Sequence, residues 1–583
     1  TNVLIAKNEE FHIFEDGISL NQSFSLLPDS QEVKAGSVEY TSFNPNIATV
    51  GKYTGIVTPV KGIYGTAIIL VKSDGYSSII RVNIKPSVTD NPESVAKPMV
   101  ATGASHTIAL KYDGTVWTWG NNTNGQLGNN STENSSSPVQ VKSADGNGYL
   151  TNIIEISAGS GHNMALRNDG TVWTWGSNTY GQLGNGSSVN SMLPVQVKSA
   201  DGNSFLTDIV QISAGYVHSM ALKKDGTVWT WGRNDGGQLG NNNTSNKSLP
   251  VQVKGGASGS EYLTDVVQVT AGNWHSMALK ANGTVYAWGW GQYGQLGNGY
   301  TTNSDDTDKY SYEKIYSAPV QVLNGAQTSE TGYLKEVVQI DAMGGTGRGE
   351  KNRFGTSLAV TESKEVYGWG NSLYGALGVK SSIVSKPVRV GTDISNAVQV
   401  AGGGKSGSDD WHVNSIGNTG YTYILKEDGT VSSLGYNVNG ELGNGANTST
   451  TNVCTVQGLT NVAQIAGSKD GNFGAAVKED GTVWTWGANT NGQLGNGTTD
   501  TPKTKPIQAG TEGSNTLVVH KITIDSSIDN TTPMGNIGVY GDNNTFVSTV
   551  TLRGDDSSAT KKFDAFSISS VDVSRKFNLN LAV

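Results

Sequence analysis

Short runs of alternating apolar and polar residues recur along this chain, and the 3.6-residue period of amphipathic helices is absent. One stretch shows the pattern clearly, with four such runs: IIEIS at 153–157, NMALR at 163–167, TVWTWG at 171–176 and PVQV at 194–197. β-Branched and aromatic residues dominate these runs, as is typical of β-strands. The pattern therefore predicts a unit of four short strands.

This unit is repeated seven times. The glycine that closes each W-G or L-G signature marks the copies, at Gly120, Gly176, Gly232, Gly289, Gly370, Gly435 and Gly487. Repeats of four antiparallel strands predict a closed β-propeller, because radial repetition removes long exposed sheet edges. A solenoid is the alternative, but the sequence contains no capping units that one would require.

Asp-Gly pairs separate the second and third strands of most units, for example at 113–114 and 169–170. Such pairs favour a two-residue type I′ hairpin turn, in which both central residues have positive φ. The fourth unit has Asn282-Gly283, which suits the same turn. The fifth has Ser363-Lys364, so its turn is predicted to differ.

The repeated pattern A-G-x-x-H-S-M-A-L…D-G-T-V-W-T-W-G-x-N-x-x-G-Q-L-G-N-G resembles the regulator of chromosome condensation family across residues 98–510. The resemblance implies a seven-bladed propeller. Residues 1–88 resemble bacterial Ig-like domains of group 2, through N-P-x-I-A-T-V and the later G-x-V-T-P-V and G-T-A-I-I strands. We expect 89–97 to be a linker and 511–583 a small β-sandwich, giving an all-β chain throughout.

Composition narrows the possible partners. The net charge is −9, charged residues make up 15% of the chain, and Cys454 is the single cysteine. An acidic chain without a basic stripe is a poor nucleic-acid binder. One cysteine forms no intrachain disulfide, and no apolar run reaches the length of a membrane span. The chain begins with Thr1, which is compatible with a processed or trimmed N-terminus.

Seven histidines suggest chemistry, but four of them occupy one repeat position: His106, His162, His218 and His275. Later units have Thr356, Tyr421 and Phe473 there, so we interpret the position as structural, packing or hydrogen-bonding within its own blade. The tryptophan pairs, such as Trp117 and Trp119, are predicted to be core between blades. Tyr149, Phe205 and Tyr262 recur in near-identical loops and are likewise predicted to pack.

No nucleophile with a recurring base, paired carboxylates or cofactor fingerprint is present, so the sequence predicts no enzyme and no cofactor. The Gly-rich stretch 344–355 lacks G-K-[ST] and is not a phosphate loop. The acidic segment 304–308 offers Asp305, Asp306 and Asp308 as weak calcium candidates, without the ligand spacing of a known loop.

Variation concentrates at the end of the blades opposite the Asp-Gly turns, which we call the top face. Three insertions lie there, at 300–318, 344–355 and 403–420. Diversified loops on a rigid scaffold are typical of binding surfaces, although neutral surface loops remain the alternative. The predicted binding residues are Tyr216, Arg233, Trp274, Trp290, Tyr310, Arg348, Trp411 and Tyr436. Of these, Trp274, Trp290, Trp411 and Tyr436 are expected to be exposed.

The leading hypothesis is a non-enzymatic extracellular protein of a bacterial surface whose propeller binds a protein or glycan. The alternative is a self-assembling subunit of a surface layer or filament, with the C-terminal strand residues Phe577, Leu579 and Leu581 joining copies. The family resemblance adds two minor alternatives, guanine-nucleotide exchange and inhibition of a secreted enzyme. Neither nucleic acid nor membrane insertion is expected.

Overall fold

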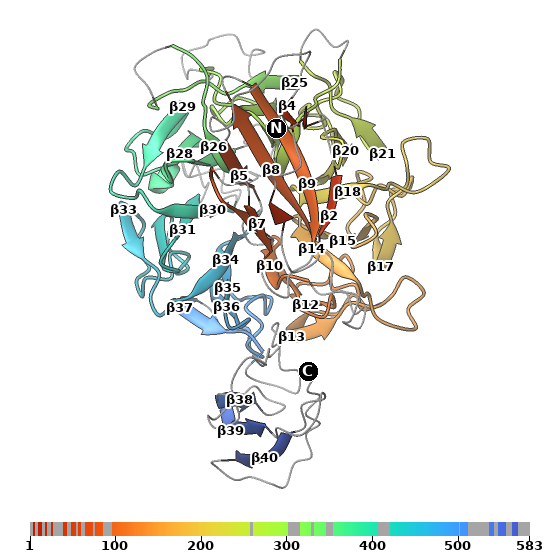
Figure 1. Cartoon of the computed structure of the whole chain (residues 1–583), viewed down its shortest axis with the longest axis vertical. Coiled ribbons are helices and arrows are strands. Elements are labelled where there is room, and N and C mark those ends of the chain that lie inside the picture. The colour runs from red at the N-terminus through yellow and green to blue at the C-terminus, as the bar shows by residue number, and fades with distance from the viewer. Residues whose placement is uncertain are drawn as a thin grey trace, which may run out of the picture.

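A computed structural model describes residues 4–5, 10–13, 18–19, 25–26, 39–43, 48–53, 56–59, 65–73, 76–84, 96–256, 261–300, 315–327, 331–344, 354–405, 420–500, 502–510, 536–540, 546–554 and 563–568. Seven four-stranded antiparallel sheets stand around a common axis (Figure 1). The predicted all-β, seven-bladed propeller is confirmed. Each blade is built from one contiguous segment, with its strands in sequence order.

Each blade runs from an inner strand at the axis to an outer strand at the rim. The inner strands are β10 (Met99–Thr102), β14 (Ile153–Ala158), β18 (Ile209–Ala214), β22 (Val266–Ala271), β26 (Val337–Met343), β30 (Ala397–Gly403) and β34 (Val462–Gly467). The second strands are β11 (His106–Leu110), β15 (His162–Arg167), β19 (His218–Lys223), β23 (His275–Lys280), β27 (Thr356–Thr361), β31 (Tyr421–Lys426) and β35 (Phe473–Lys478).

The outer half of each blade holds the W-G signature and the loops that follow it. The third strands are β12 (Val116–Gly120), β16 (Val172–Gly176), β20 (Val228–Gly232), β24 (Val285–Trp290), β28 (Val366–Asn371), β32 (Val431–Gly435) and β36 (Val483–Gly487). The fourth strands are β13 (Ser135–Gln140), β17 (Ser191–Gln196), β21 (Lys247–Gln252), β25 (Ile315–Gln321), β29 (Ile383–Val390), β33 (Thr450–Thr455) and β37 (Lys503–Gln508). A short 3₁₀ turn, η2 (Leu373–Gly375), follows β28.

Hydrogen bonds between neighbouring blades hold the ring together. The indole Nε1 of Trp175 donates to the carbonyl of Gln126 in the preceding blade at 3.0 Å, and Trp231 Nε1 donates to the Gln182 carbonyl at 2.9 Å. The first and last blades join in the same way, through Trp119 Nε1 and the Gln493 carbonyl at 2.9 Å. The ring therefore closes by repeating its ordinary blade-to-blade contact, with no strand exchanged between sheets.

The repeated histidines also act between blades. His162 Nε2 lies 3.0 Å from Ser219 Oγ of the next blade, and His106 Nε2 lies 2.9 Å from Asn163 Oδ1. The role is structural, as predicted, but the partner is a neighbouring blade rather than the histidine's own. The glycine of A-G-x-x-H leaves space for the imidazole, since a Cβ on Gly159 would lie 2.3 Å from His162 Cε1.

A ladder of glutamine amides connects the inner strands around the channel. Gln211 Oε1 accepts from the Val269 amide of the next blade at 2.8 Å, and Gln464 Oε1 accepts from the Val100 amide at 2.9 Å. Glu155 takes the same position in the second blade and accepts from Ile212 N at 3.3 Å. Burial raises the pKa of this carboxyl to about 8, because its charged form is poorly hydrated there.

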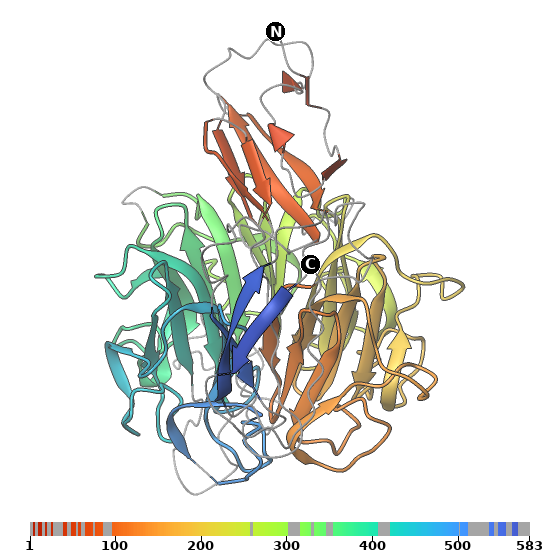
Figure 2. The same ribbon diagram turned by 60° about the horizontal axis from the view of Figure 1, so that its bottom comes forward.

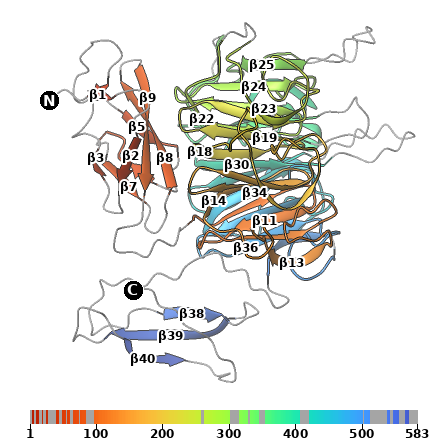
Figure 3. The same cartoon turned by 90° about the vertical axis from the view of Figure 1, so that its right-hand side faces the viewer.

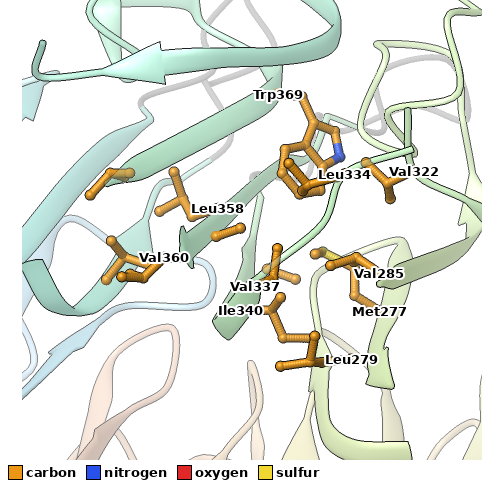
Figure 4. Packing of buried hydrophobic residues seen from close by; sticks show 14 of the residues in the cluster. Met277, Leu279, Val285, Val322, Leu334, Val337, Ile340, Leu358, Val360 and Trp369 are labelled. Atoms are coloured by element: carbon orange, nitrogen blue, oxygen red, sulfur yellow. The ribbon is translucent and has the colours of Figure 1, made fainter. Parts of the chain in front are cut away.

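The apolar core lies between the blades as well as within them. Trp119, Trp175, Trp231 and Trp486 are fully buried, which confirms the prediction for the second tryptophan of each pair, and Trp369, which follows a tyrosine instead, is buried as well. Figure 4 shows Trp369 among aliphatic side chains of the fourth and fifth blades, including Leu334, Val322 and Val337. The first tryptophan is only partly buried, and a cation covers its ring, as Lys111 Nζ does at 5.2 Å from the Trp117 centroid.

The Asp-Gly turns differ from the predicted type I′ hairpin. Gly114 N donates to Lys111 O and Lys111 N donates to Thr115 O, so the loop has three residues and ends on a left-handed glycine. Asp113 is not left-handed; its carboxylate instead accepts from Thr115 N and Oγ1 at 3.0 and 2.6 Å.

The prediction that the turn of the fifth unit differs is wrong as well. The same hydrogen bonds form there, from Lys364 N to Thr361 O and from Thr361 N to Glu365 O. Lys364 takes the glycine position with φ of 60°. The hydrogen-bond frame of the blade therefore imposes the turn even on a residue that disfavours it.

Small sheets flank the propeller. In the N-terminal region β2 (Glu10–Ile13), β9 (Tyr76–Ile84), β8 (Gly65–Ser73) and β5 (Glu39–Ser42) form one sheet, β3 (Ile18–Ser19), β7 (Ile56–Pro59) and β6 (Ala48–Val50) form a second, and β1 (Leu4–Ile5) pairs with β4 (Ser25–Leu26). The C-terminal region contains β38 (Asn536–Tyr540), β39 (Phe546–Gly554) and β40 (Phe563–Ile568). The Ig-like and sandwich assignments, and the domain boundaries, stay predictions.

The N-terminal sheets lie against the bottom face, where the Asp-Gly turns are (Figures 2 and 3). Leu70 of β8 and Phe43 belong to the same apolar cluster as Val267 and Val338, near the starts of β22 and β26. The bottom opening of the ring is therefore partly covered, and the described part of the top face is not.

The buried histidines make the ring sensitive to acid. Burial lowers the pKa of His106 to about 4 and of His162, His218 and His275 to about 3. Neighbouring histidines lower the pKa further at His162 and His218, and Lys469 lowers it at His218 and His275. Below about pH 6.5 these histidines are protonated in the unfolded chain but remain neutral in the folded chain. Each one therefore lowers the free energy of unfolding by about 1.4 kcal/mol for every pH unit by which the pH is lowered.

We predict that the thermal midpoint of the propeller decreases as the pH is lowered from about 6.5 to about 5. Glu155 and Glu441 oppose this trend, because their pKa values are raised and protonation favours the folded state, but four histidines outweigh two carboxyls. Glu155→Gln should therefore steepen the decline. Calorimetry across this range checks both points, and an unchanged midpoint in the wild type would contradict the account.

Candidate functional site

The top face is formed by two loops of every blade. His106 pairs with Gly120 at this end of the hairpin, and the Asn121 amide donates to Ser105 O at 2.8 Å, so the A-G-x-x-H turn and the W-G-x-N loop lie side by side. The predicted geometry is confirmed. Residues of these two loops that vary between blades consequently share one surface.

An arginine held between two aromatic rings is the most organised feature of this face. The Arg233 guanidinium lies 4.5 Å from the Trp274 ring centroid and 4.6 Å from that of Tyr180. Its Nε and Nη2 donate to the two carboxylate oxygens of Asp235 at 2.8 and 2.6 Å. Arg233 is 18% exposed and Asp235 39%, so both present polar edges to solvent from a fixed position.

Tyr216 extends the cluster, with its ring centroid 5.9 Å from that of Trp274. Two predicted exposures are corrected here. Trp274 is 4% exposed and Trp290 is 2% exposed. Trp290 prolongs β24, pairs with Ile315 and lies against Gly236 of the preceding blade. These tryptophans support the surface from beneath.

More aromatic side chains continue the arc around the rim. Tyr374 and Tyr436 meet edge to face with centroids 5.1 Å apart, and Tyr293 lies 4.2 Å from Phe354. Burial raises the pKa of Tyr436 to about 12, with further contributions from Glu441 and Tyr374, so its hydroxyl stays protonated at neutral pH. We name Tyr180, Tyr216, Arg233, Asp235, Tyr374 and Tyr436 the top arc.

Buried polar atoms without partners lie beneath the top arc. The Asn273 side chain is fully buried, and neither its nitrogen nor its oxygen has a hydrogen-bond partner. The same holds for Gln238 Nε2, whereas the matching Gln126 Nε2 donates to Asn121 Oδ1 at 2.7 Å. Arg233 replaces that acceptor in the third blade. Such unsatisfied groups cost stability, and in native proteins they concentrate where function requires them.

The remaining predicted residues lie outside the described part of the chain. They are Tyr310, Arg348 and Trp411 of the insertions, the calcium candidates Asp305, Asp306 and Asp308, and the assembly candidates Phe577, Leu579 and Leu581. Among the described residues, no cluster of three or more metal-ligating side chains occurs. No helix in that part of the structure is both long and apolar enough to cross a membrane.

Sequence reasoning missed Tyr180 and Tyr374. Both stand directly before the glycine that opens the G-Q-L-G or G-A-L-G motif, as Tyr293 does. Comparing that position between units would have found them, because the other units have Asn or Gly there.

The fold and its repeated loops define a class of protein, the RCC1-like propellers. The RCC1-like domain family matches residues 74–406 and 150–524, and the chain belongs to this family. The ultraviolet-B receptor UVR8 of Arabidopsis thaliana is 30% identical over 416 residues, covering 70% of this chain and 80% of that protein.

Solved structures agree on the fold. Yeast RCC1 (Prp20), in a structure bound to Kap60, gives a TM-score of 0.52 at 20% identity, covering 71% of this chain and 85% of that one. Saccharomyces cerevisiae Prp20p, in a structure described with its binding properties to Gsp1p and histones, gives 0.50 at 21% identity, covering 70% and 87%.

One prediction is overturned by these relatives. The sequence was interpreted as excluding an enzyme, yet the human E3 ubiquitin-protein ligase HERC2 is 32% identical over 296 residues. That match covers 50% of this chain and 5% of HERC2. Propellers of this family thus occur within enzymes, and missing catalytic motifs in the repeats do not exclude one.

The unpartnered amide yields a stability prediction. Asn273→Ala removes two unsatisfied buried groups and should raise the free energy of unfolding by up to about 1 kcal/mol, after the loss of packing is counted. Thermal unfolding of the full chain measures the change.

The matched control is Asn122, also fully buried, whose side chain accepts from Leu127 N and donates to Ser131 O and Glu133 O. Asn122→Ala should lower the free energy of unfolding by about 2 kcal/mol or more. Equal destabilisation by the two substitutions would contradict our interpretation of Asn273.

Proposed function

We propose that this chain is a protein-recognition propeller that engages its partner through the top arc. The observation that carries the proposal is Arg233, stacked between Tyr180 and Trp274 and oriented by Asp235. Arginine, tyrosine and tryptophan are the residues that most often dominate binding energy at protein interfaces. Because contacts already fix the guanidinium, little side-chain entropy is lost when a partner binds.

Location supports this choice of surface. The N-terminal sheets pack against the bottom face through Leu70 and Phe43, so the top face is the broad surface left for a partner. Structures of the yeast relative name proteins as its partners, namely Kap60, Gsp1p and histones. We extend to this chain only the coarse property of protein binding.

We further propose an extracellular setting at a bacterial surface. The low content of charged residues and the N-terminal resemblance to bacterial Ig-like domains support it. In such a setting the N-terminal region holds the propeller by its bottom face and presents the top arc outward. Self-assembly is the alternative and predicts that copies of the chain are the partner.

The test compares capture of a native partner by two variants of the full chain. Arg233→Ala combined with Tyr216→Ala and Tyr436→Ala should weaken binding at least about 100-fold, since hot-spot truncations contribute about 2 kcal/mol or more each. The control replaces three exposed aromatics elsewhere: Tyr149→Ala, Phe205→Ala and Tyr262→Ala.

Arg233→Lys sharpens the comparison, because it keeps the charge and loses the planar stacking and the two-point contact with Asp235. It should retain less than about a tenth of the affinity. Partners would be captured from extracts of the source cells and their affinities measured by interferometry. Equal losses in the top-arc and control variants would refute the assignment of the top face.

A further inference from the structure

Four successive connections between blades each expose one aromatic side chain at the same repeat position. Tyr149, Phe205, Tyr262 and Tyr333 are exposed by 55%, 50%, 47% and 47%. They lie between the fourth strand of one blade and the inner strand of the next, at the bottom rim. The prediction that Tyr149, Phe205 and Tyr262 pack into the structure is therefore wrong.

The backbone explains their exposure. Each aromatic residue forms an isolated antiparallel bridge, for example Tyr149 with Lys142 and Phe205 with Lys198. Successive side chains of an extended segment point to opposite sides, so the next residue points inward. Leu150 and Leu206 accordingly are buried, at 5% and 4% exposure. The leucine anchors the loop and leaves the ring outside.

Hydrogen bonds fix the backbone of the two loops that carry Tyr149 and Phe205. Ser143 N donates to Gly148 O and Gly148 N donates to Ser143 Oγ, each at 2.9 Å. The Asp145 carboxylate accepts from Ser143 Oγ and from Asn147 N at 2.5 and 3.1 Å, and these bonds hold its pKa below the usual range. The loop of Phe205 repeats this network through Ser199, Asp201 and Asn203.

The loops that carry the rings also carry polar groups suited to hydroxyl ligands. The exposed Asp145 and Asp201 are charged acceptors, and lysines lie on the facing strand of three of the loops. Lys254 Nζ lies 4.1 Å from the centroid of the Tyr262 ring. Aromatic faces are electron-rich and attract weakly positive C–H groups, which sugar rings present on one side while hydroxyls project from the edge.

We propose that these four loops form a binding track for a neutral polysaccharide. The rings belong to separate connections between successive blades, so a compact ligand reaches one of them, whereas an extended and repetitive polymer reaches several. Several weak, simultaneous contacts raise the total affinity well above that of one ring. The chain's net charge of −9 and the carboxylates in the loops of Tyr149 and Phe205 disfavour a polyanion. This track is independent of the top arc.

Native gel electrophoresis of the full chain tests the proposal, because the acidic chain migrates freely at alkaline pH. Gels would contain one of four neutral polymers: mixed-linkage β-glucan, hydroxyethylcellulose, xylan or galactomannan. At least one should retard the wild type. The combined variant Tyr149→Ala, Phe205→Ala, Tyr262→Ala and Tyr333→Ala should weaken retardation at least about 30-fold, and single variants about threefold.

Two controls separate this from other outcomes. Tyr374→Ala removes a comparably exposed ring on the top face and should leave retardation unchanged, as should the Arg233 variant that tests protein binding. Thermal midpoints of the variants check that they fold. The proposal would be overturned if none of the four polymers retards the wild type, or if only the polyanion dextran sulfate does. It would also be overturned if the combined variant is retarded as strongly as the wild type.

Discussion

The ring depends on one repeated interaction, the hydrogen bond from a tryptophan indole to a backbone carbonyl in the preceding blade, which six of the seven blades make. The sixth blade has Leu434 at the tryptophan position. The same carbonyl also accepts from the residue after the histidine position, as Gln182 O does from Ser219 Oγ at 2.8 Å and from Trp231 Nε1 at 2.9 Å. A buried indole N–H without an acceptor is costly, so the tryptophan and the G-Q-L-G loop must be kept together. Because the bond crosses between blades, no blade is complete alone.

Substitutions within the frame show how it tolerates change. In the fifth blade Ala376 replaces the glutamine, and its carbonyl still accepts from Thr422 Oγ1 of the sixth blade at 2.7 Å. In the sixth, the Glu441 carbonyl accepts from Tyr423 OH of the same blade and from Trp486 Nε1 of the seventh. Tyr421 of the sixth blade replaces histidine and donates its own hydrogen bond to Phe473 O of the seventh. The acceptor is a backbone carbonyl, so the bond between blades does not depend on which side chain occupies this position or the neighbouring loop positions. The top arc uses that freedom.

Much of this architecture could be predicted from the sequence, because the spacing of the repeated motif gives the number of blades. The alternation of apolar and polar residues along each strand indicates which side chains are buried. The errors were of two kinds. The Asp-Gly pair is compatible with several turns. The hydrogen bond that the Thr115 amide donates to the Asp113 carboxylate accompanies the three-residue loop, and composition does not reveal it. Burial of Trp274 and Trp290, and exposure of Tyr149, depend on how neighbouring loops pack around each side chain rather than on residue type.

The central claim is that a rigid ring presents the top arc as its recognition surface. Hydroxyl-radical footprinting of the full chain, alone and with its captured partner, tests this most directly, since tyrosine oxidation reports side-chain accessibility. The account predicts that Tyr180, Tyr216, Tyr374 and Tyr436 become protected on binding, while Tyr149 and Tyr333 on the bottom rim are oxidised as before. Protection confined to the bottom rim, with the top arc unchanged, would contradict it.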